Sequence, residues 1–361
     1  TSMAASTPSV SRPPVTTPAA VLAARRIADE VLKPNAEHVD VTGVRRETLD
    51  LFATEGLLGL VGPQEYGGAA ASGPVVREVV ELLGGADGAT WFVSAQHTLP
   101  LLAVARTQNE ALKERVLRAM CAGTLISGVA IAHVRRPSTP AVTAVRESNG
   151  WRYDGTVAWM TAWGLCDVFL LGGLSPDGEL VLSLLEARDQ PGLQASEQLQ
   201  LAAMQATATV QLHLDGLFVA DADVVEVTDA AAWLLADAAK SANVVPAVFG
   251  LLRTILDLLA PTAPELAQRM TDEGARIRTE AYRLIDEVRS GEQVERRLEL
   301  RAEAIELAVR AATALVVASG GRAMSLSAAP QRLLREAAFH TVQAQTAPVR
   351  AATLRHLLSR S

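Results

Sequence analysis

Two histidines, His97 and His340, are the side chains of this sequence best suited to proton transfer. Imidazole changes its charge close to neutral pH, so either side chain can give or take a proton during catalysis. A hydrogen-bonded, partly buried histidine with a structural role is the alternative for each. His38, His213 and His356 are interpreted as structural or exposed. No two histidines have the spacing of metal ligands, and we therefore predict no metal site.

Two short segments contain residues that suit phosphate binding. In Ala132-His133-Val134-Arg135-Arg136-Pro137-Ser138, each arginine can bind a phosphate through two parallel hydrogen bonds. An arginine pair is more often part of a surface loop, which is the alternative here. The pair Gly320-Gly321 allows a pyrophosphate or a neighbouring chain to approach the backbone closely. A helix C-cap followed by a loop explains the same two glycines equally well.

The composition limits the classes of protein to which these residues can belong. Of the 361 residues, 49% are hydrophobic and 20% are charged, which excludes a largely disordered chain and supports a sizeable core. The formal net charge of −7 argues against general nucleic-acid binding. Cys121 and Cys166 are too few for a disulfide scaffold or a cysteine-rich metal site. No apolar run reaches the roughly 18 uncharged residues of a membrane span, so we expect a cytoplasmic protein without a membrane partner.

The first third of the chain has the periodicity of helices. Residues 1–18 are rich in Ser, Thr, Ala and Pro, which predicts a flexible tail and argues against a signal peptide. Apolar residues then recur at helical spacing, and Gly and Pro interrupt the pattern. We therefore predict an N-terminal helical domain over 19–122, with helices at 20–32, 45–58, 74–83, 90–105 and 109–122.

The pattern changes to short strands after Gly123. Asn149-Gly150 is a typical hairpin turn, and further Gly-containing turns separate the apolar runs that follow. This spacing predicts an antiparallel β-domain of sandwich or barrel type over 123–229, with strands at 126–132, 141–147, 151–153, 156–161, 167–172, 179–185 and 209–218.

The last third is helical again. Over 230–361 we predict helices at 231–259, 263–290, 292–318 and 330–358. Glu and Arg alternate through 292–306, which is typical of a solvated helix face. The fold class predicted for the whole chain is therefore α+β multi-domain, with a helical domain, an antiparallel β-domain and a C-terminal four-helix bundle.

This domain order and five short motifs resemble the acyl-CoA dehydrogenase superfamily of flavoproteins. The resemblance covers nearly the whole chain from about Ala20 and implies the same three domains. The motifs are Glu55-Gly56-Leu57-Leu58-Gly59-Leu60 with Pro63 and Glu65-Tyr66-Gly67-Gly68, then Gly150-Trp151-Arg152-Tyr153-Asp154-Gly155 with Trp159-Met160-Thr161, then 204–224, then Ser319-Gly320-Gly321, and finally Arg335-Glu336-Ala337.

The resemblance implies a flavin site. Trp159 stands where the family packs an aromatic ring against the flavin, and Thr161 where the family places a residue near the reactive flavin nitrogen. A flat redox-active ring requires a hydrogen-bond donor near the atom that gains charge and an apolar wall that excludes water. The alternative is that both side chains simply fill a strand. By the same resemblance, Gly320 and Gly321 serve the flavin pyrophosphate.

The sequence departs from the family at the catalytic base. The family's C-terminal segment carries a glutamate that removes the proton α to the thioester carbonyl, and Ala344 occupies that position here. Some members carry the base on the first helix of the bundle instead, where this chain has Lys240. A base would therefore have to be another residue, and Glu336 and His340 are the candidates. His97 lies on a helix that lines the family's substrate pocket.

The phosphate and adenosine ends of the flavin site also differ from the family. The segment with His133, Arg135 and Arg136 replaces the family's pyrophosphate loop, and 258–264 replaces its adenosine-binding motif. FAD is the cofactor that the resemblance implies, and FMN or no flavin are the alternatives.

Three functions are consistent with these residues. The first is a flavin-dependent oxidoreductase that acts on an acyl thioester of coenzyme A or of a carrier protein. The second is a flavin-dependent monooxygenase of the same fold that uses His97 and His340 in place of a carboxylate base. The third is a catalytically silent subunit or binding protein that pairs with an active paralogous subunit. The resemblance also implies a homodimer or homotetramer.

Overall fold

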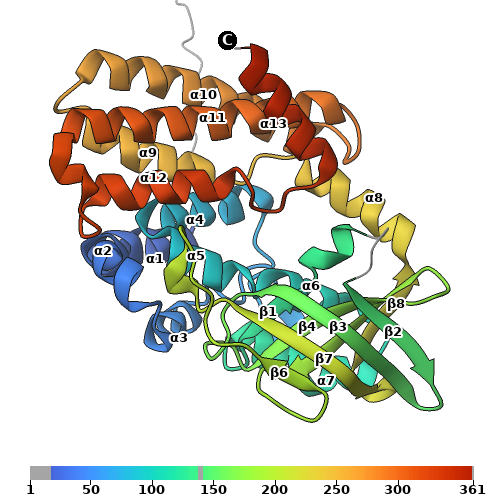
Figure 1. Ribbon diagram of the computed structural model, residues 1–361. Coiled ribbons are helices and arrows are strands. Elements are labelled where there is room, and N and C mark those ends of the chain that lie inside the picture. The colour runs from blue at the N-terminus through green and yellow to red at the C-terminus, as the bar shows by residue number, and fades with distance from the viewer. Residues whose placement is uncertain (1–17, 137–140, 360–361) are drawn as a thin grey trace, which may run out of the picture.

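The computed structural model describes residues 18–136 and 141–359. Helices from the first third of the chain, a central sheet and a second set of helices follow one another along the sequence and pack together (Figure 1). This is the predicted α+β fold class. The tail expected over 1–18 lies outside the described residues except for its last residue, Pro18.

The N-terminal part is helical to residue 122. Its helices are α1 (Ala19–Ile27), a π-helical turn (Ala28–Leu32), α2 (Lys33–Thr42), α3 (Arg46–Thr54), α4 (Gly73–Ala86), α5 (Gly88–Ala95), α6 (Thr98–Arg106) and α7 (Glu110–Ala122). The helix predicted over 20–32 continues to residue 42 through the π-helical turn. The prediction of one helix over 90–105 was wrong, because the chain breaks at Gln96 and His97 before α6. Pro100, in the first turn of α6, is the sequence signal for that break.

The middle part is one sheet with the strand order β6-β7-β3-β2-β4-β5-β8, and β1 pairs with β4. Most pairs are antiparallel, but β1 and β2 each run parallel to β4, so the prediction of a purely antiparallel domain was wrong. The chain can form these parallel pairs because it leaves the sheet between the partners. The strands are β1 (Ser127–Ala130), β2 (Val142–Glu147), β3 (Gly150–Met160), β4 (Val168–Leu174), β5 (Glu179–Glu186), β6 (Leu193–Ala195), β7 (Val210–Ala220) and β8 (Val224–Asp229).

Two strands were not predicted, and a third was predicted as two separate strands. The strands β6 and β8 were not predicted, because β6 is only three residues long and β8 follows β7 after a single helical turn. The segments predicted at 151–153 and 156–161 form one strand, β3, whose register against β7 shifts between Tyr153 and Gly155.

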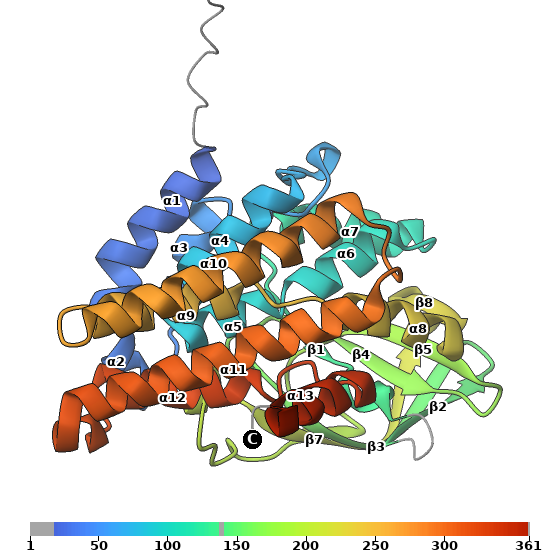
Figure 2. The same ribbon diagram turned by 90° about the horizontal axis from the view of Figure 1, so that it is seen from above.

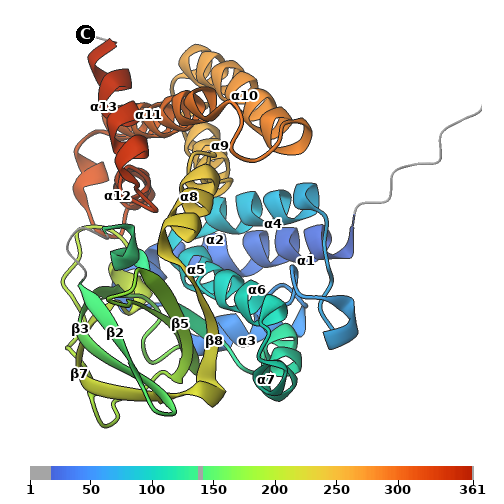
Figure 3. The ribbon, with the colours of Figure 1, turned by 90° about the vertical axis from the view of Figure 1, so that its right-hand side faces the viewer.

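The C-terminal part is a helical bundle that α8 joins to the sheet (Figure 3). Its helices are α8 (Ala230–Ser241), α9 (Ala247–Leu259), α10 (Pro264–Glu287), α11 (Val294–Ser319), α12 (Ala329–His340) and α13 (Ala347–Ser359). The predicted helices 231–259 and 330–358 are each interrupted, at 242–246 and 341–346, so both predictions were wrong in length. Pro246 and Pro348 mark the restarts, since proline is tolerated only in the first turn of a helix.

Two buried arginines of α11 hold the bundle together at the carboxyl ends of other helices. Arg297 Nη2 donates to the carbonyl oxygens of Leu284 at 2.8 Å and Val288 at 3.0 Å, where α10 ends. Arg301 Nη1 donates to the carbonyl of Ser241 at the end of α8. Its Nη2 donates to the carbonyl of Gln343, after α12, at 2.6 Å. A helix ends in unpaired carbonyls with partial negative charge, so a buried guanidinium stabilises it.

The prediction that 292–306 presents a solvated face was therefore wrong for Arg297 and Arg301, whose exposed fractions are 3% and 2%. The alternation of Glu and Arg along one helix does not show which ends of other helices pack against it. Charged partners on other helices do cover the remaining face, as between Arg296 and Glu280.

Helices α4 and α9 cross at very short range (Figure 2). A Cβ atom placed on Gly250 of α9 would lie 1.9 Å from the carbonyl oxygen of Glu81 in α4, and one on Gly85 would lie 2.5 Å from the carbonyl oxygen of Gly250. The buried Glu81 carboxylate then accepts from Arg278 Nε at 2.7 Å and from the Tyr282 hydroxyl at 2.6 Å. The N-terminal helices are thus fastened to the bundle by close backbone packing and by one carboxylate.

The helical stretch Val294–Met324, which comprises α11 and the turn after it, has the length and apolar composition of a membrane span. Within the described residues α11 packs against α9, α10, α12 and α13. A core helix of a bundle has the same length and composition.

We predict that Gly250→Ala destabilises the fold by about 3 kcal/mol, because the added methyl group forces α4 and α9 apart. Chemical denaturation monitored by circular dichroism measures this loss. Gly321→Ala is the matched control, since no atom lies within 4 Å of the Cβ position there. Equal stability of the two variants would contradict the close crossing.

Candidate active site

Trp159 and Thr161 lie at the end of β3, with opposite exposure. The Trp159 side chain is 55% exposed, although a large aromatic side chain is usually covered. The Thr161 hydroxyl is buried and bonds to the Thr209 hydroxyl at 3.1 Å, which bonds to that of Thr207 at 2.8 Å. The site thus presents an open aromatic surface beside a buried series of hydroxyl groups. A planar ligand would cover the first and find hydrogen-bonding groups in the second.

The predicted phosphate-binding residues are only partly free to bind a ligand. Arg135 forms a bidentate ion pair with Asp237 of α8, with N–O distances of 2.8 and 2.9 Å. His133 Nε2 lies 2.7 Å from the carbonyl oxygen of Gly172, and burial lowers the pKa of this imidazole. Arg136 is exposed. The guanidinium of Arg135 therefore already has a carboxylate partner, and Arg136 is the arginine that remains available to a phosphate.

Gly320 and Gly321 form the exposed turn after α11. Gly320 follows the last helical residue with a φ of +67°, a conformation that favours glycine, and its backbone N–H bonds to the carbonyl oxygens of Val316 and Val317. The C-cap interpretation therefore accounts for Gly320. No atom lies within 4 Å of a Cβ position on either glycine, so the turn also leaves room for a ligand or another chain.

Glu336 lies in a buried cluster that joins α12 to α5. Its Oε1 accepts from Arg332 Nη1 at 2.6 Å, while Oε2 has no hydrogen-bond partner. A Cβ on Gly88 would lie 2.8 Å from Oε2, so only glycine fits there. Burial raises the pKa of Glu336 to about 7, against the opposing effect of Arg332, and the nearby Asp87 raises it further.

His340 lies one helical turn after Glu336 and is 3% exposed. Its ring packs against Trp91 of α5, with 5.9 Å between ring centroids. Burial, together with the positive charge of Arg301, lowers the pKa of His340 to about 3, so the ring is neutral at physiological pH. Its Nδ1 atom has no hydrogen-bond partner. The ring therefore has one nitrogen free to exchange a hydrogen bond with a ligand.

His97 lies apart from this cluster, at the break before α6. Ser127 donates to Nδ1 through its backbone N–H at 2.9 Å, and Nε2 lies 3.0 Å from the carbonyl oxygen of Met120. Because Nδ1 accepts a hydrogen bond, the proton of the neutral ring lies on Nε2. The Nε2–H group therefore donates to the carbonyl oxygen of Met120. Burial lowers the pKa of this ring to about 4. Both nitrogens are therefore occupied, and the geometry gives a catalytic role of His97 no support.

Neither position of the family's base holds a carboxylate. Ala344 lies half-buried in the link between α12 and α13, with a φ of +46°. Lys240 is exposed near the end of α8, whereas a lysine acts as a base only when it is strongly desolvated.

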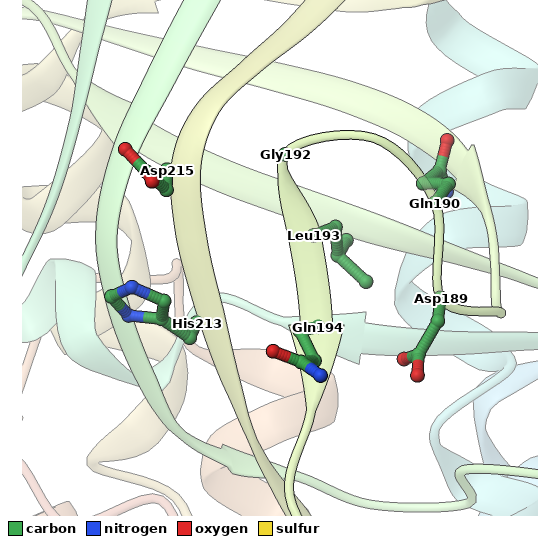
Figure 4. A pocket seen from close by; sticks show the side chains of 7 residues that line it. All are labelled: Asp189, Gln190, Gly192, Leu193, Gln194, His213 and Asp215. Atoms are coloured by element: carbon green, nitrogen blue, oxygen red, sulfur yellow. The ribbon is translucent and has the colours of Figure 1, made fainter.

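A separate pocket of about 370 Å³ lies at the edge of the sheet around β6 and β7 (Figure 4). Its lining consists of Asp189, Gln190, Gly192, Leu193, Gln194, His213 and Asp215. None of the predicted site residues belongs to it. We assign it no part in the chemistry.

Trp91 packs against His340 and Arg301 lowers its pKa, but neither residue was predicted to belong to the site. No pattern in the sequence pairs either with His340, since they come from α5 and α11. Glu336 and His340 were named from the resemblance of their segment to the family.

Comparison with known proteins agrees with this architecture. Residues 19–124 match the family model "Acyl-CoA dehydrogenase, N-terminal domain". The probable acyl-CoA dehydrogenase YngJ of Bacillus subtilis is 26% identical over 206 residues, which are 55% of this chain and 54% of that protein. The matched region spans little more than half the length of the curated relatives.

Solved structures match over nearly the whole chain. The butyryl-CoA dehydrogenase of Megasphaera elsdenii has a TM-score of 0.80 at 16% identity and covers 94% of this chain and 97% of its own. The FAD complex of PigA has a TM-score of 0.81 at 18% identity and covers 95% and 97%. The fold of the chain is the three-domain acyl-CoA dehydrogenase fold of these structures. The match of residues 19–124 and the curated relatives support membership of the acyl-CoA dehydrogenase superfamily.

We predict that the stability conferred by Glu336 depends on pH. Its pKa is raised from 4.5 to about 7 in the folded protein, so the folded state binds this proton more tightly and stability falls as the pH rises between those values. Glu336→Gln cannot ionise. From pH 4.5 to 7, wild type should therefore lose on the order of 3 kcal/mol relative to this variant.

Thermal denaturation of both proteins across this pH range measures the difference. Glu265→Gln, at an exposed position of α10, is the matched control and should follow wild type. A constant difference between wild type and Glu336→Gln would contradict the raised pKa.

Proposed function

We propose that this chain is a flavin-dependent oxidoreductase that acts on an acyl thioester of coenzyme A or of a carrier protein. The observation that carries the proposal is the half-exposed ring of Trp159 beside the buried hydroxyl of Thr161. Membership of the superfamily supports flavin as the planar ligand that covers this ring. FAD is the cofactor we propose, and FMN is the alternative.

The residues that would contact the flavin ring fit this ligand better than the residues that would contact its phosphates. Trp159 supplies an apolar wall, and Thr161 supplies a hydroxyl that can donate to the ring once its bond to Thr209 is exchanged. The groups that remain available to bind the phosphates are Arg136 and the open turn at Gly320 and Gly321. A bound flavin supplies the acceptor for a hydride from the substrate.

Proton transfer would then depend on α12 rather than on a glutamate at position 344. His340 is the candidate catalytic residue, because its free Nδ1 faces no partner of the chain. Glu336 exchanges its proton near neutral pH and lies one turn away, so it is suited to position and polarise this end of α12. His97 takes no part in this arrangement.

A second candidate function is a flavin-dependent monooxygenase. The favouring observation is that alanine and an exposed lysine occupy the two base positions, while a neutral histidine lies beside a buried arginine. Insertion of oxygen would require a proton donor but no base for the α-proton, and a neutral histidine could serve as that donor. The cytoplasmic location, the homo-oligomeric state and pairing with a paralogous subunit stay predictions.

We predict that the full-length chain binds flavin and that Trp159→Ala weakens this binding about tenfold, because the ring loses its stacking surface. Titration with FAD and with FMN, followed by flavin fluorescence, measures both dissociation constants. Phe218→Ala is the matched control, since Phe218 is also an exposed aromatic residue of the sheet, 44% exposed. If neither flavin binds wild type, both redox functions fail and the silent-subunit hypothesis remains.

We predict that a saturated acyl-CoA bleaches the bound flavin under anaerobic conditions, and that Thr161→Val slows bleaching about a hundredfold while flavin binding is retained. Stopped-flow absorbance measures the rate. Bleaching of Thr161→Val at the wild-type rate would remove Thr161 from the site. The monooxygenase would be favoured if thioesters leave the wild-type flavin oxidised and the chemically reduced flavin then reacts with oxygen.

A further inference from the structure

Two buried basic side chains next to the missing base have unused hydrogen-bonding nitrogens. Arg301 is 2% exposed, and its Nε atom has no hydrogen-bond partner. His340 is 3% exposed, and its Nδ1 atom has none. Leaving such groups unpaired in the interior is costly, so each requires an explanation.

Two other buried basic residues, Arg297 and His97, have a partner at every side-chain nitrogen. Arg297 precedes Arg301 by one helical turn and is 3% exposed, yet its Nε donates to the carbonyl of Glu292 at 2.8 Å and both Nη atoms have partners. His97 likewise has a partner at each ring nitrogen. Arg77 and Arg335 also have an Nε without a hydrogen-bond partner, but each forms an ion pair with a carboxylate, with Asp286 and Asp40 respectively. Arg301 differs because its unpaired Nε belongs to a guanidinium that bonds to backbone carbonyls alone.

The positive charge of Arg301 is not paired with a carboxylate among the described residues. In the part of the chain that the structure describes, Arg301 forms hydrogen bonds with backbone carbonyls and no ion pair. Burial and the nearby Arg135 lower its pKa to about 10, so it remains charged at neutral pH. Asp237 is already paired with Arg135, and Glu336 with Arg332.

The link from α12 to α13 lies beside these nitrogens and is partly exposed. Arg301 Nη2 is bonded to the carbonyl of Gln343, which is the residue before Ala344. Gln343 and Ala344 are only half-buried, and the Gln343 side-chain oxygen also has no partner. Trp91, which packs against His340, adds an indole Nε1 without a partner.

We propose that Arg301 and His340 form a carboxylate-binding subsite beside Ala344, and that the acyl group of the substrate carries this carboxylate. A carboxylate accepts a charge-assisted hydrogen bond from Arg301 Nε and a second bond from His340 in its Nδ1-protonated tautomer. In such a complex His340 binds the substrate through Nδ1, and Glu336 is the residue of α12 that remains for proton transfer. The family's carboxylate base at position 344 is thus replaced by alanine, and the substrate supplies the negative charge. The identity of the ligand as an acyl group rests on the proposed function, whereas carboxylate binding does not.

The first experiment measures free carboxylates on the full-length protein without added thioester. We expect succinate to raise the melting temperature of wild type and to bind measurably by calorimetry, whereas succinamide and sodium chloride at equal ionic strength do neither. Arg301→Gln and His340→Phe should each weaken succinate binding about tenfold. Arg297→Gln is the matched control and should bind succinate as wild type does. Because Arg301 also holds helix ends, His340→Phe tests the subsite independently if Arg301→Gln fails to fold.

The second experiment distinguishes a free acid from an acyl group. We expect succinyl-CoA to bind wild type about tenfold more tightly than butyryl-CoA, which has the same acyl length without the carboxylate, and His340→Phe to abolish this preference. Equal affinity for the two thioesters, together with tight succinate binding, would overturn the assignment to the acyl group. The subsite would be overturned if wild type and His340→Phe bind succinate equally. It would also be overturned if sodium chloride raises the melting temperature of wild type as much as succinate does. Flavin titration is separate, so failure of the cofactor proposal is recognised independently.

Discussion

The contacts of Arg297 and Arg301 with backbone carbonyls are the constraint on which the rest of the bundle depends. These two side chains of α11 meet the carboxyl ends of α8 and α10 and the link after α12. Each of these segments would otherwise leave unpaired carbonyls in the interior, where water cannot satisfy them. Because α8 also joins the bundle to the sheet, the bonds of Arg301 to Ser241 and Gln343 connect the helix that leads from the β-domain with the link after α12.

The same constraint determines what the candidate site can contain. Arg301 brings the link with Ala344 close to His340, and α5 closes the other side through Trp91 and Gly88. Side chains from α5, α11 and α12 therefore meet in one place. The local chemistry there is that of a buried cation and a neutral imidazole. A shared fold does not determine the chemistry of a site, so the function has to be argued from these side chains.

The sequence predicted those features that are local or that follow a strong period. Helical spacing located most helices, and turn residues located the longer strands, but not β6 and β8. The helix breaks at His97, at 242–246 and at 341–346 were missed, although Pro100, Pro246 and Pro348 mark the helices that follow them. Glu336 and His340 were named as candidates from the family resemblance of their segment. Arg297 and Arg301 were interpreted as solvated, because no sequence pattern shows that ends of distant helices lie against them.

The fluorescence of the exposed Trp159 indole can report the binding of a ligand to this site. The chain has five tryptophans, and the other four, at positions 91, 151, 163 and 233, are buried or half-buried. An indole in water emits at longer wavelength than a buried one, so the red edge of the emission spectrum comes mainly from Trp159. A conjugated molecule that stacks on this ring accepts its excitation energy and quenches that edge selectively. Occupancy of the ring can therefore be followed in the purified, unlabelled protein.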